Sequence, residues 1–263
     1  MKIYTSLLII ILSVSLSKSV RSQSFEILSN NITQTDAPLR HAIILNDSTV
    51  IAVGGWGWGS GVIIKSNDFG HSWTPTDTEK ALFSVYFAND SIGYATGEGA
   101  TIMKTIDAGE SWIYQNSGIA AAFQLRTVAF LNPDTGFVGT ANGPDYAFLH
   151  TYNGGETWHN SEPGSVYGRA KLQKVNDSTI YALPYDNGFF KSTNFGTSWE
   201  SVFLPENTGS SRDMHFFNKD TGLVATREYS SSCGNNMFLS KTNDGGITWT
   251  TDLFECDYVD NHY

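Results

Sequence analysis

Residues 66–73 read Ser66-Asn67-Asp68-Phe69-Gly70-His71-Ser72-Trp73, and this octapeptide decides the fold because it recurs along the chain. Further copies stand at 105–112 (TIDAGESW), 151–158 (TYNGGETW), 192–199 (STNFGTSW) and 242–249 (TNDGGITW). The final tryptophans of successive copies are 39, 46, 41 and 50 residues apart. Repeats of this length are typical of the four-stranded blades of a β-propeller.

A hairpin pattern precedes each octapeptide. Residues 85–95, 128–138 and 214–224 each run from an alternating apolar stretch through an Asn/Asp/Gly turn into a strand of small residues, and shorter turns stand at 46–48 and 176–178. Alternation interrupted by such turns is typical of antiparallel hairpins. Each repeat is therefore expected to run as strand A, turn, strand B, loop, strand C, octapeptide turn and strand D. The sequence predicts an all-β propeller with at least five blades of four antiparallel strands.

The third octapeptide position admits a catalytic and a structural interpretation. Asp68, Asp107 and Asp244 are acids, but Asn153 and Asn194 fill the same position and keep only the hydrogen-bond acceptor. Such side chains accept hydrogen bonds from turn N–H groups, and the shared glycine suits a positive φ. The tryptophan is a large apolar side chain whose burial stabilises a blade by roughly 2–3 kcal/mol. We interpret these octapeptide residues as structural: Asp68, Trp73, Asp107, Trp112, Asn153, Trp158, Asn194, Trp199, Asp244 and Trp249.

The N-terminus is expected to be a secretory signal peptide. Lys2 precedes an apolar stretch from Leu7 to Leu16, and Val20 and Ser22 supply small side chains for cleavage. Such a stretch is too short to span a bilayer. We assign residues 1–22 to the signal peptide and residues 23–263 to the propeller, which predicts a secreted or periplasmic protein. Either five blades close the ring, or the chain is a fragment of a six- or seven-bladed propeller, and we favour missing blades.

The charge balance excludes several classes of partner. The chain has 16 Lys and Arg against 26 Asp and Glu, and removing the signal peptide leaves 13 bases. Such an acidic surface repels phosphate backbones and anionic lipid heads, so we expect no nucleic-acid or membrane partner. Cys233 and Cys256, the two cysteines of an exported chain, are expected to form a disulfide, with two unpaired thiols as the alternative. We expect neither a metal nor another cofactor, since two thiols make no four-ligand zinc site.

Four arginines mark one end of the expected channel. Each precedes the first turn of its repeat by six residues, or by seven in the fourth repeat, and so begins strand A: Arg40, Arg126, Arg212 and Arg169. In so acidic a protein, this placement predicts a site for an anion or a carboxylate. The alternative is that each arginine pairs with a local acid such as Asp213 and shapes a connection.

Two tryptophans stand in the B–C loop of the first repeat, at the same end of the blades. Trp56 and Trp58 alternate with glycines between Gly54 and Gly61. Their rings can stack on a sugar or an apolar side chain of a ligand. Alternatively, they pack onto the neighbouring blade.

The repeated octapeptides resemble the Asp boxes of the BNR/Asp-box group of propellers, over nearly all of residues 23–263. The hairpin before each box is most similar to the photosystem II stability/assembly-factor type, which implies a platform for protein partners. Sialidases, xyloglucanases and sortilin-type receptors also carry Asp boxes. A sialidase-like arginine triad can be imitated by Arg40, Arg126 and Arg212, but we find no matching Tyr/Glu pair. Glycoside hydrolysis ordinarily needs two carboxyl groups. Glu98, between Gly97 and Gly99, is one candidate, but the sequence does not identify its partner.

These observations favour a secreted, non-catalytic propeller. We expect it to bind a protein partner or an acidic glycan at the arginine-lined end of the channel. The alternative is a sialidase-like or other glycoside hydrolase.

Overall fold

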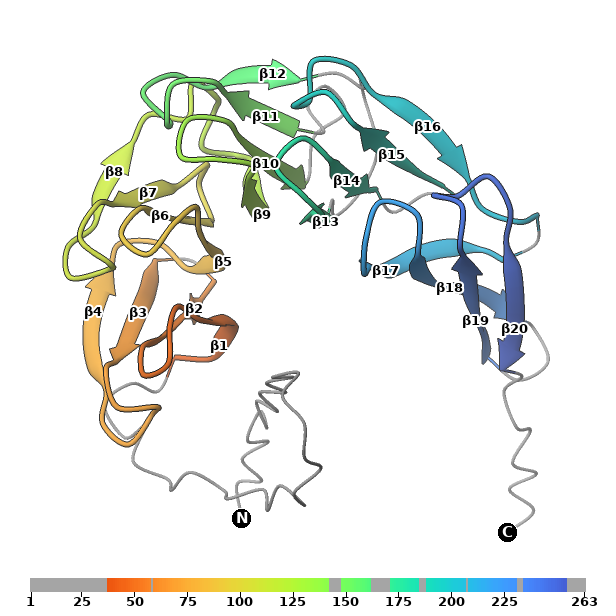
Figure 1. The fold of residues 1–263 in the computed structure, drawn as a ribbon. Helices are drawn as coiled ribbons and strands as arrows, with labels where there is room; N and C mark the ends of the chain where they lie inside the picture. Colours follow the sequence, from red (N-terminus) through yellow and green to blue (C-terminus); the bar gives the residue numbers. More distant parts are fainter. Residues whose placement is uncertain are drawn as a thin grey trace, which may run out of the picture.

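The computed structural model describes residues 37–57, 59–141, 148–161, 171–184, 188–206, 208–230 and 234–254. These residues form twenty β-strands and no helix, arranged as five four-stranded antiparallel sheets. Figure 1 shows the sheets following one another along an arc. The predicted all-β architecture of four-stranded blades is confirmed.

Within each blade the strands pair in chain order. The blades consist of β1 (Leu39–Ile44), β2 (Val50–Trp56), β3 (Ser60–Ser66) and β4 (Thr74–Thr78); β5 (Leu82–Phe87), β6 (Gly93–Gly97), β7 (Ile102–Thr105) and β8 (Ile113–Gln115); β9 (Gln124–Phe130), β10 (Gly136–Ala141), β11 (Phe148–Thr151) and β12 (His159–Ser161); β13 (Lys171–Lys174), β14 (Ile180–Leu183), β15 (Gly188–Ser192) and β16 (Glu200–Phe203); and β17 (Ser210–Phe216), β18 (Gly222–Ser230), β19 (Gly234–Thr242) and β20 (Thr250–Phe254).

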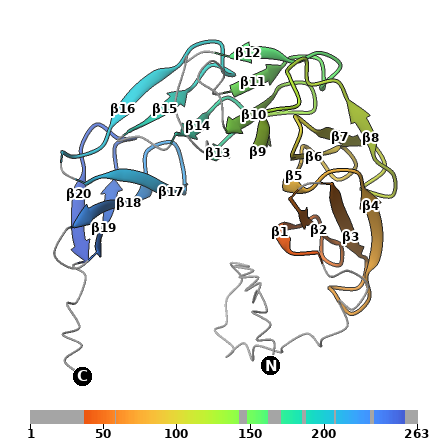
Figure 2. The same cartoon turned by 180° about the vertical axis from the view of Figure 1, so that it is seen from behind.

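The first strand of each blade lies on the concave side of the arc, and the fourth lies on its outer rim. Figures 1 and 2 show β1, β5, β9, β13 and β17 inside, with β4, β8, β12, β16 and β20 outside. In both views the described part of the first blade and that of the fifth stand apart across an open gap. The inner strands of neighbouring blades lie against one another.

Apolar clusters fill the spaces between successive blades. The second strands are buried along their whole length in the first four blades, apart from Trp56, because they lie between two layers of side chains. Each interface pairs a residue of one second strand with a residue of the next inner strand: Ile51 with Leu82, Tyr94 with Leu125, Phe137 with Leu172, and Tyr181 with Met214. Burial of these side chains holds the blades together.

The octapeptide tryptophans join these interfaces. Trp158 is buried, and the other four are half-buried. Trp112 and Trp158 meet the edges of Phe87 and Phe130 at ring-centre distances of 6.0 Å in both pairs. Edge-to-face contacts of this kind are a preferred geometry for aromatic pairs.

An asparagine builds the turn between the first two strands of every blade. In the first blade, Oδ1 of Asn46 accepts hydrogen bonds from the backbone N–H groups of Ser48 (3.0 Å) and Thr49 (2.9 Å). Asn89, Asn132, Asn176 and Asn218 accept the equivalent pair of bonds. This is the local hydrogen bonding that favours Asn in turns.

Several predictions concern residues outside the described part of the chain. They are the signal peptide (1–22), Trp58, Arg169, and the disulfide between Cys233 and Cys256. These stay predictions. Among the described residues, no helix is long and apolar enough to cross a membrane.

Candidate binding face

The two ends of each blade carry different chemistry. At one end, the octapeptide turn is joined to the turn between the first two strands by a backbone hydrogen bond, such as Phe69 N–H to Ser48 O (2.9 Å) in the first blade. At the other end lie the loops between second and third strands, the connections between blades, and the starts of the inner strands. We call this second end, with Arg40, Phe83, Arg126, Trp56 and Arg212, the arginine face.

The octapeptide acids are engaged within their own turns. Oδ1 of Asp68 accepts hydrogen bonds from the Ser66 hydroxyl (2.7 Å) and from Ser72 N–H (2.8 Å), and Oδ2 accepts one from the Ser72 hydroxyl (2.6 Å). Asp107 and Asp244 accept the same three bonds.

These hydrogen bonds stabilise the charged carboxylates. The hydroxyl at the seventh octapeptide position makes the largest contribution, and the pKa values of Asp68, Asp107 and Asp244 fall to about 2. A carboxylate with so low a pKa holds no proton to donate near neutral pH. Such groups do not suit the general-acid role in glycoside hydrolysis.

The two asparagine boxes preserve this geometry by reversing one bond. Oδ1 of Asn153 still accepts from Thr157 N–H (3.0 Å), but its Nδ2 donates to the Thr157 hydroxyl (2.9 Å). Asn194 makes the same pair of bonds with Ser198. Both Asp and Asn therefore hold this turn in the same chain.

On the arginine face, three successive inner strands bring two arginines onto one aromatic ring. The guanidinium carbon of Arg126 lies 4.0 Å from the centre of the Phe83 ring, and that of Arg40 lies 5.3 Å from it. Both distances are in the range of cation–π attraction. Arg40 also donates to Gly55 O (3.2 Å from Nη2), and Arg126 donates to Oε1 of Gln124. The structure thus brings Arg40 and Arg126 together across the second blade.

Phe83 was missed in the sequence analysis, although the sequence carries a signal for it. Phe83 stands six residues before the turn residue Asn89, which is the spacing of Arg40, Arg126 and Arg212 before their own turn asparagines. The same register in the second blade therefore holds an aromatic side chain instead of a cation. An alignment of the repeats by their turns would have placed it between the arginines.

Arg212 lies apart from this pair, on the inner strand of the fifth blade. Its side chain is largely exposed. The pKa of Arg212 is lowered by partial loss of solvent around the guanidinium group and, to a smaller extent, by the charge of Arg227. The neighbouring acid Asp213 pairs with Lys171 of the fourth blade and accepts a hydrogen bond from Met214 N–H (2.8 Å). In the fifth blade, the cation near Arg212 is Arg227 and not Arg40 or Arg126.

Trp56 and Glu98 belong to loops at the same end of their blades. Trp56, at the end of β2, is 57% exposed, so its ring is accessible to a ligand. Glu98 follows β6, and its N–H donates to Ala81 O (2.9 Å). The three octapeptide acids stand at the opposite ends of their blades, so none of them can be the second carboxyl group that hydrolysis with Glu98 would require.

A cavity of about 400 Å³ opens among the inner strands. Side chains of one inner strand there bind the backbone of the next: Nδ1 of His41 accepts from Val85 N–H (3.2 Å), and the Tyr86 hydroxyl donates to Phe130 O (2.9 Å). Burial lowers the pKa of His41. His41 and Tyr86 therefore use their polar groups to join the inner strands of neighbouring blades.

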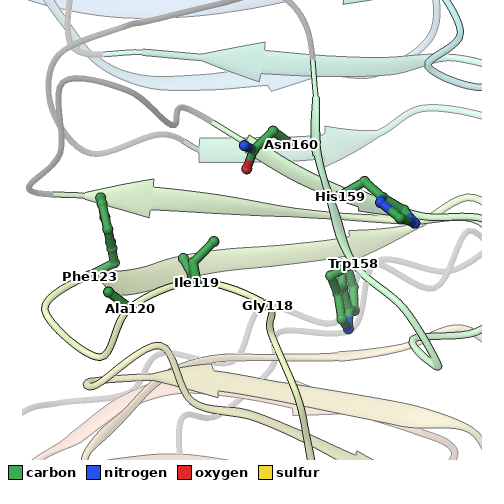
Figure 3. A pocket seen from close by; sticks show the side chains of 7 residues that line it. All are labelled: Gly118, Ile119, Ala120, Phe123, Trp158, His159 and Asn160. Atoms are coloured by element: carbon green, nitrogen blue, oxygen red, sulfur yellow. The ribbon is translucent and has the colours of Figure 1, made fainter.

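A second hollow, of about 510 Å³, lies between the start of β12 and the connection that enters the third blade. Figure 3 shows Ile119, Ala120 and Phe123 on the connection, together with Trp158 and Asn160, which lie just before and within β12. Neither hollow is lined by the predicted arginines. Arg40, Arg126 and Arg212 therefore lie outside these two cavities.

Comparison with known proteins gives one family match. The model of the family described as "Photosynthesis system II assembly factor YCF48" matches residues 74–215. A search of curated protein sequences found no match.

Similar solved structures include hydrolases and assembly factors. The GH74 enzyme of Niastella koreensis aligns with a TM-score of 0.71 and 16% identity, covering 82% of this chain but only 38% of its own length. A structure titled "YCF48 bound to D1 peptide" aligns with a TM-score of 0.52 and 16% identity over 83% of this chain and 82% of its own. The GH74 xyloglucanase of Xanthomonas campestris aligns with a TM-score of 0.58 and 13% identity, covering 78% and 36%. At these identities the likeness shows the propeller fold alone.

Proposed function

Since the chain belongs to the photosynthesis system II assembly factor YCF48 family, we propose that it is a non-catalytic propeller that binds a protein partner at the arginine face. The partner segment presents carboxylates to Arg40 and Arg126. The proposal retains the export predicted from residues 1–22. A propeller offers a rigid surface for docking and needs no chemistry to do so.

The observation that carries this proposal is the stacking of Arg40 and Arg126 on Phe83. Two guanidinium groups held beside one ring repel each other, and a carboxylate between or beside them relieves that repulsion. Contact with the ring also restrains the planar groups, so less side-chain entropy is lost when they form paired hydrogen bonds to a carboxylate. The accessible Trp56 ring adds an apolar surface at the same end of the first blade.

The charge of the whole chain supports an anionic ligand at this place. The formal net charge is −10, so an acidic segment approaching elsewhere meets repulsion. Attraction is limited to places where cations gather, and Arg40 and Arg126 form such a place. A protein segment is preferred to an acidic glycan because a structure of the same family is titled as bound to a peptide.

A glycoside hydrolase is the second candidate, because two of the similar structures are GH74 enzymes. Their alignment rests on the fold, and this chain spans 38% and 36% of their lengths. Hydrolysis of xyloglucan or of fluorogenic sialosides by the purified chain, lost on changing Glu98→Gln, would support this candidate over the binding propeller.

Binding is tested with immobilised peptides that carry several Asp or Glu residues and a free carboxyl terminus. We expect the double variant Arg40→Gln/Arg126→Gln to bind at least about tenfold more weakly, because hydrogen bonds to charged groups are worth about 1.5–3 kcal/mol. The matched control is Lys241→Gln, which removes one exposed positive charge from the octapeptide end of the fifth blade. Equal loss in both variants would show a general charge effect and contradict the proposal, as would unchanged binding in the double variant.

A further inference from the structure

The third blade departs from the others at one cross-strand position. In four blades, the residue just before the octapeptide is a lysine on the third strand. It lies opposite the first residue of the fourth strand, which follows the octapeptide tryptophan. The pairs are Lys65 with Thr74, Lys104 with Ile113, Lys191 with Glu200, and Lys241 with Thr250. In the third blade both members are histidines, His150 on β11 and His159 on β12.

The two imidazoles lie on the same face of the sheet. Residues directly opposite each other on antiparallel strands point to the same side, and the ring centres of His150 and His159 are 5.8 Å apart with their planes at 39°. His159 also lines the hollow beside Ile119 and Ala120, whereas His150 does not (Figure 3).

Two of the lysines at this position bond to the next blade, whereas Nδ1 of His150 makes no such bond among the described residues. Nζ of Lys65 pairs with Glu110 of the next blade (2.6 Å), and Nζ of Lys104 donates to Gly154 O (2.7 Å). Nδ1 of His150 is buried and has no hydrogen-bond partner in the described part of the chain. A buried polar atom without a partner is costly, and it calls for a ligand or another explanation.

We infer that His150 and His159 form a binding site for a late transition-metal ion such as Cu²⁺, Ni²⁺ or Zn²⁺. Neutral imidazole is a preferred ligand of these ions, and a metal–imidazole bond is about 2.0–2.1 Å long, so one ion can join rings at this separation.

The site has two histidine ligands, of which His150 is half-buried and His159 is exposed. Within the described residues, no group of three or more His, Cys, Asp or Glu surrounds a common point. His159 is exposed, so water can complete the coordination. The Tyr152 ring lies 4.8 Å from the His150 ring and bounds the site on one side. Because Cu²⁺ forms the most stable complexes in this series of ions, it is the most sensitive probe.

The test is titration of the tag-free chain with Cu²⁺, followed by calorimetry and electron paramagnetic resonance. We expect one ion per chain, with the spectral signature of nitrogen ligands. Two variants restore residues that other blades use at these positions: His150→Lys and His159→Thr. Each removes one ligand, and we expect affinity to fall by at least about tenfold, since even loss of a group that supports a ligand commonly costs 10–100-fold.

Two further histidines provide matched controls. His71 and His215 are exposed and lie outside the pair, so His71→Gln and His215→Gln should leave Cu²⁺ affinity unchanged. His150→Gln, whose side chain carries no charge, serves if His150→Lys fails to fold. Unchanged affinity in folded variants of either paired histidine would overturn the inference, and so would an equal loss in the His71 and His215 variants.

Discussion

Tyr94 of the second blade stacks on Phe130 of the third, with ring centres 3.8 Å apart and planes within 10° of parallel. Its hydroxyl reaches past that ring and donates to Gly154 O in the octapeptide turn of the third blade (2.9 Å). Tyr181 of the fourth blade makes a similar pair of contacts with the fifth. It stacks on Phe216 with ring centres 3.9 Å apart, and its hydroxyl donates to Lys219 O at 2.8 Å. A single tyrosine thus holds both an inner strand and a turn of the following blade.

The first prediction concerns this hydroxyl. Tyr94→Phe keeps the stacked ring and removes the donor, and Gly154 O retains its bond from Lys104. We therefore expect a loss of about 1 kcal/mol in the free energy of unfolding, the net value of an ordinary hydrogen bond. Urea unfolding measures it. Tyr152→Phe, at a 48% exposed side chain, is the control and should change stability by less than about 0.5 kcal/mol.

The second prediction concerns the hydroxyl that begins each octapeptide. Thr105 is buried, and its Oγ1 accepts from Gly109 N–H (2.9 Å) while donating to Asp107 (2.7 Å). Thr105→Ala leaves the buried Gly109 N–H without a partner and should cost about 1–3 kcal/mol in the free energy of unfolding.

The control for this change comes from the chain itself. Ser66 and Ser192 make the same bonds in the first and fourth blades. Thr105→Ser should therefore retain most of the stability that Thr105→Ala loses. Equal unfolding midpoints for the Ala and Ser variants would show that the hydroxyl is not what holds the turn.

The third prediction is a loss of stability in acid. The folded-state pKa values of Asp68, Asp107 and Asp244 are about 2, below their ordinary value of 3.8. A lowered folded-state pKa means that the unfolded chain binds protons first as the pH falls. The contribution of these turns to stability is therefore complete above about pH 4–5 and is lost progressively as the pH falls toward 2.

Urea midpoints measured between pH 7 and pH 2 test this dependence. The variant Asp68→Asn/Asp107→Asn/Asp244→Asn imitates Asn153 and Asn194, which hold the same turn without a titrating group. Its midpoint should fall less steeply between pH 5 and pH 2 than that of the parent chain. The same slope in both proteins would assign the acid sensitivity to other carboxyl groups.

Much of the fold was predictable because its determinants are local. The octapeptide carries its own hydrogen-bond network, with a hydroxyl at the first position, an Asp or Asn at the third, and a glycine at the fifth. The backbone at the fourth and fifth positions is left-handed in all five copies, as Phe69 (φ 59°) and Gly70 (φ 89°) show in the first. Asn46 and its equivalents build the adjacent turn, between the first two strands, from hydrogen bonds within three residues. Such short-range patterns are visible in any one repeat.

The candidate site was only partly predictable. The spacing of Arg40, Arg126 and Arg212 from their turns placed all three at the starts of inner strands, where the structure has them. Nothing in that spacing distinguishes Arg126, which meets Arg40 across Phe83, from Arg212, which lies near Arg227. The distinction depends on contacts between residues more than forty positions apart.

The sequence by itself determined the repeat, the four-strand order of each blade, the octapeptide turns, and the end of the blade at which Arg40, Arg126 and Arg212 lie. These follow from hydrogen bonds and strand alternation within about ten residues. The tertiary structure alone decided that Phe83 holds two arginines and that Tyr94 reaches the next blade. It also decided that His150 faces His159, because pairing register and the angle between blades set which side chains meet.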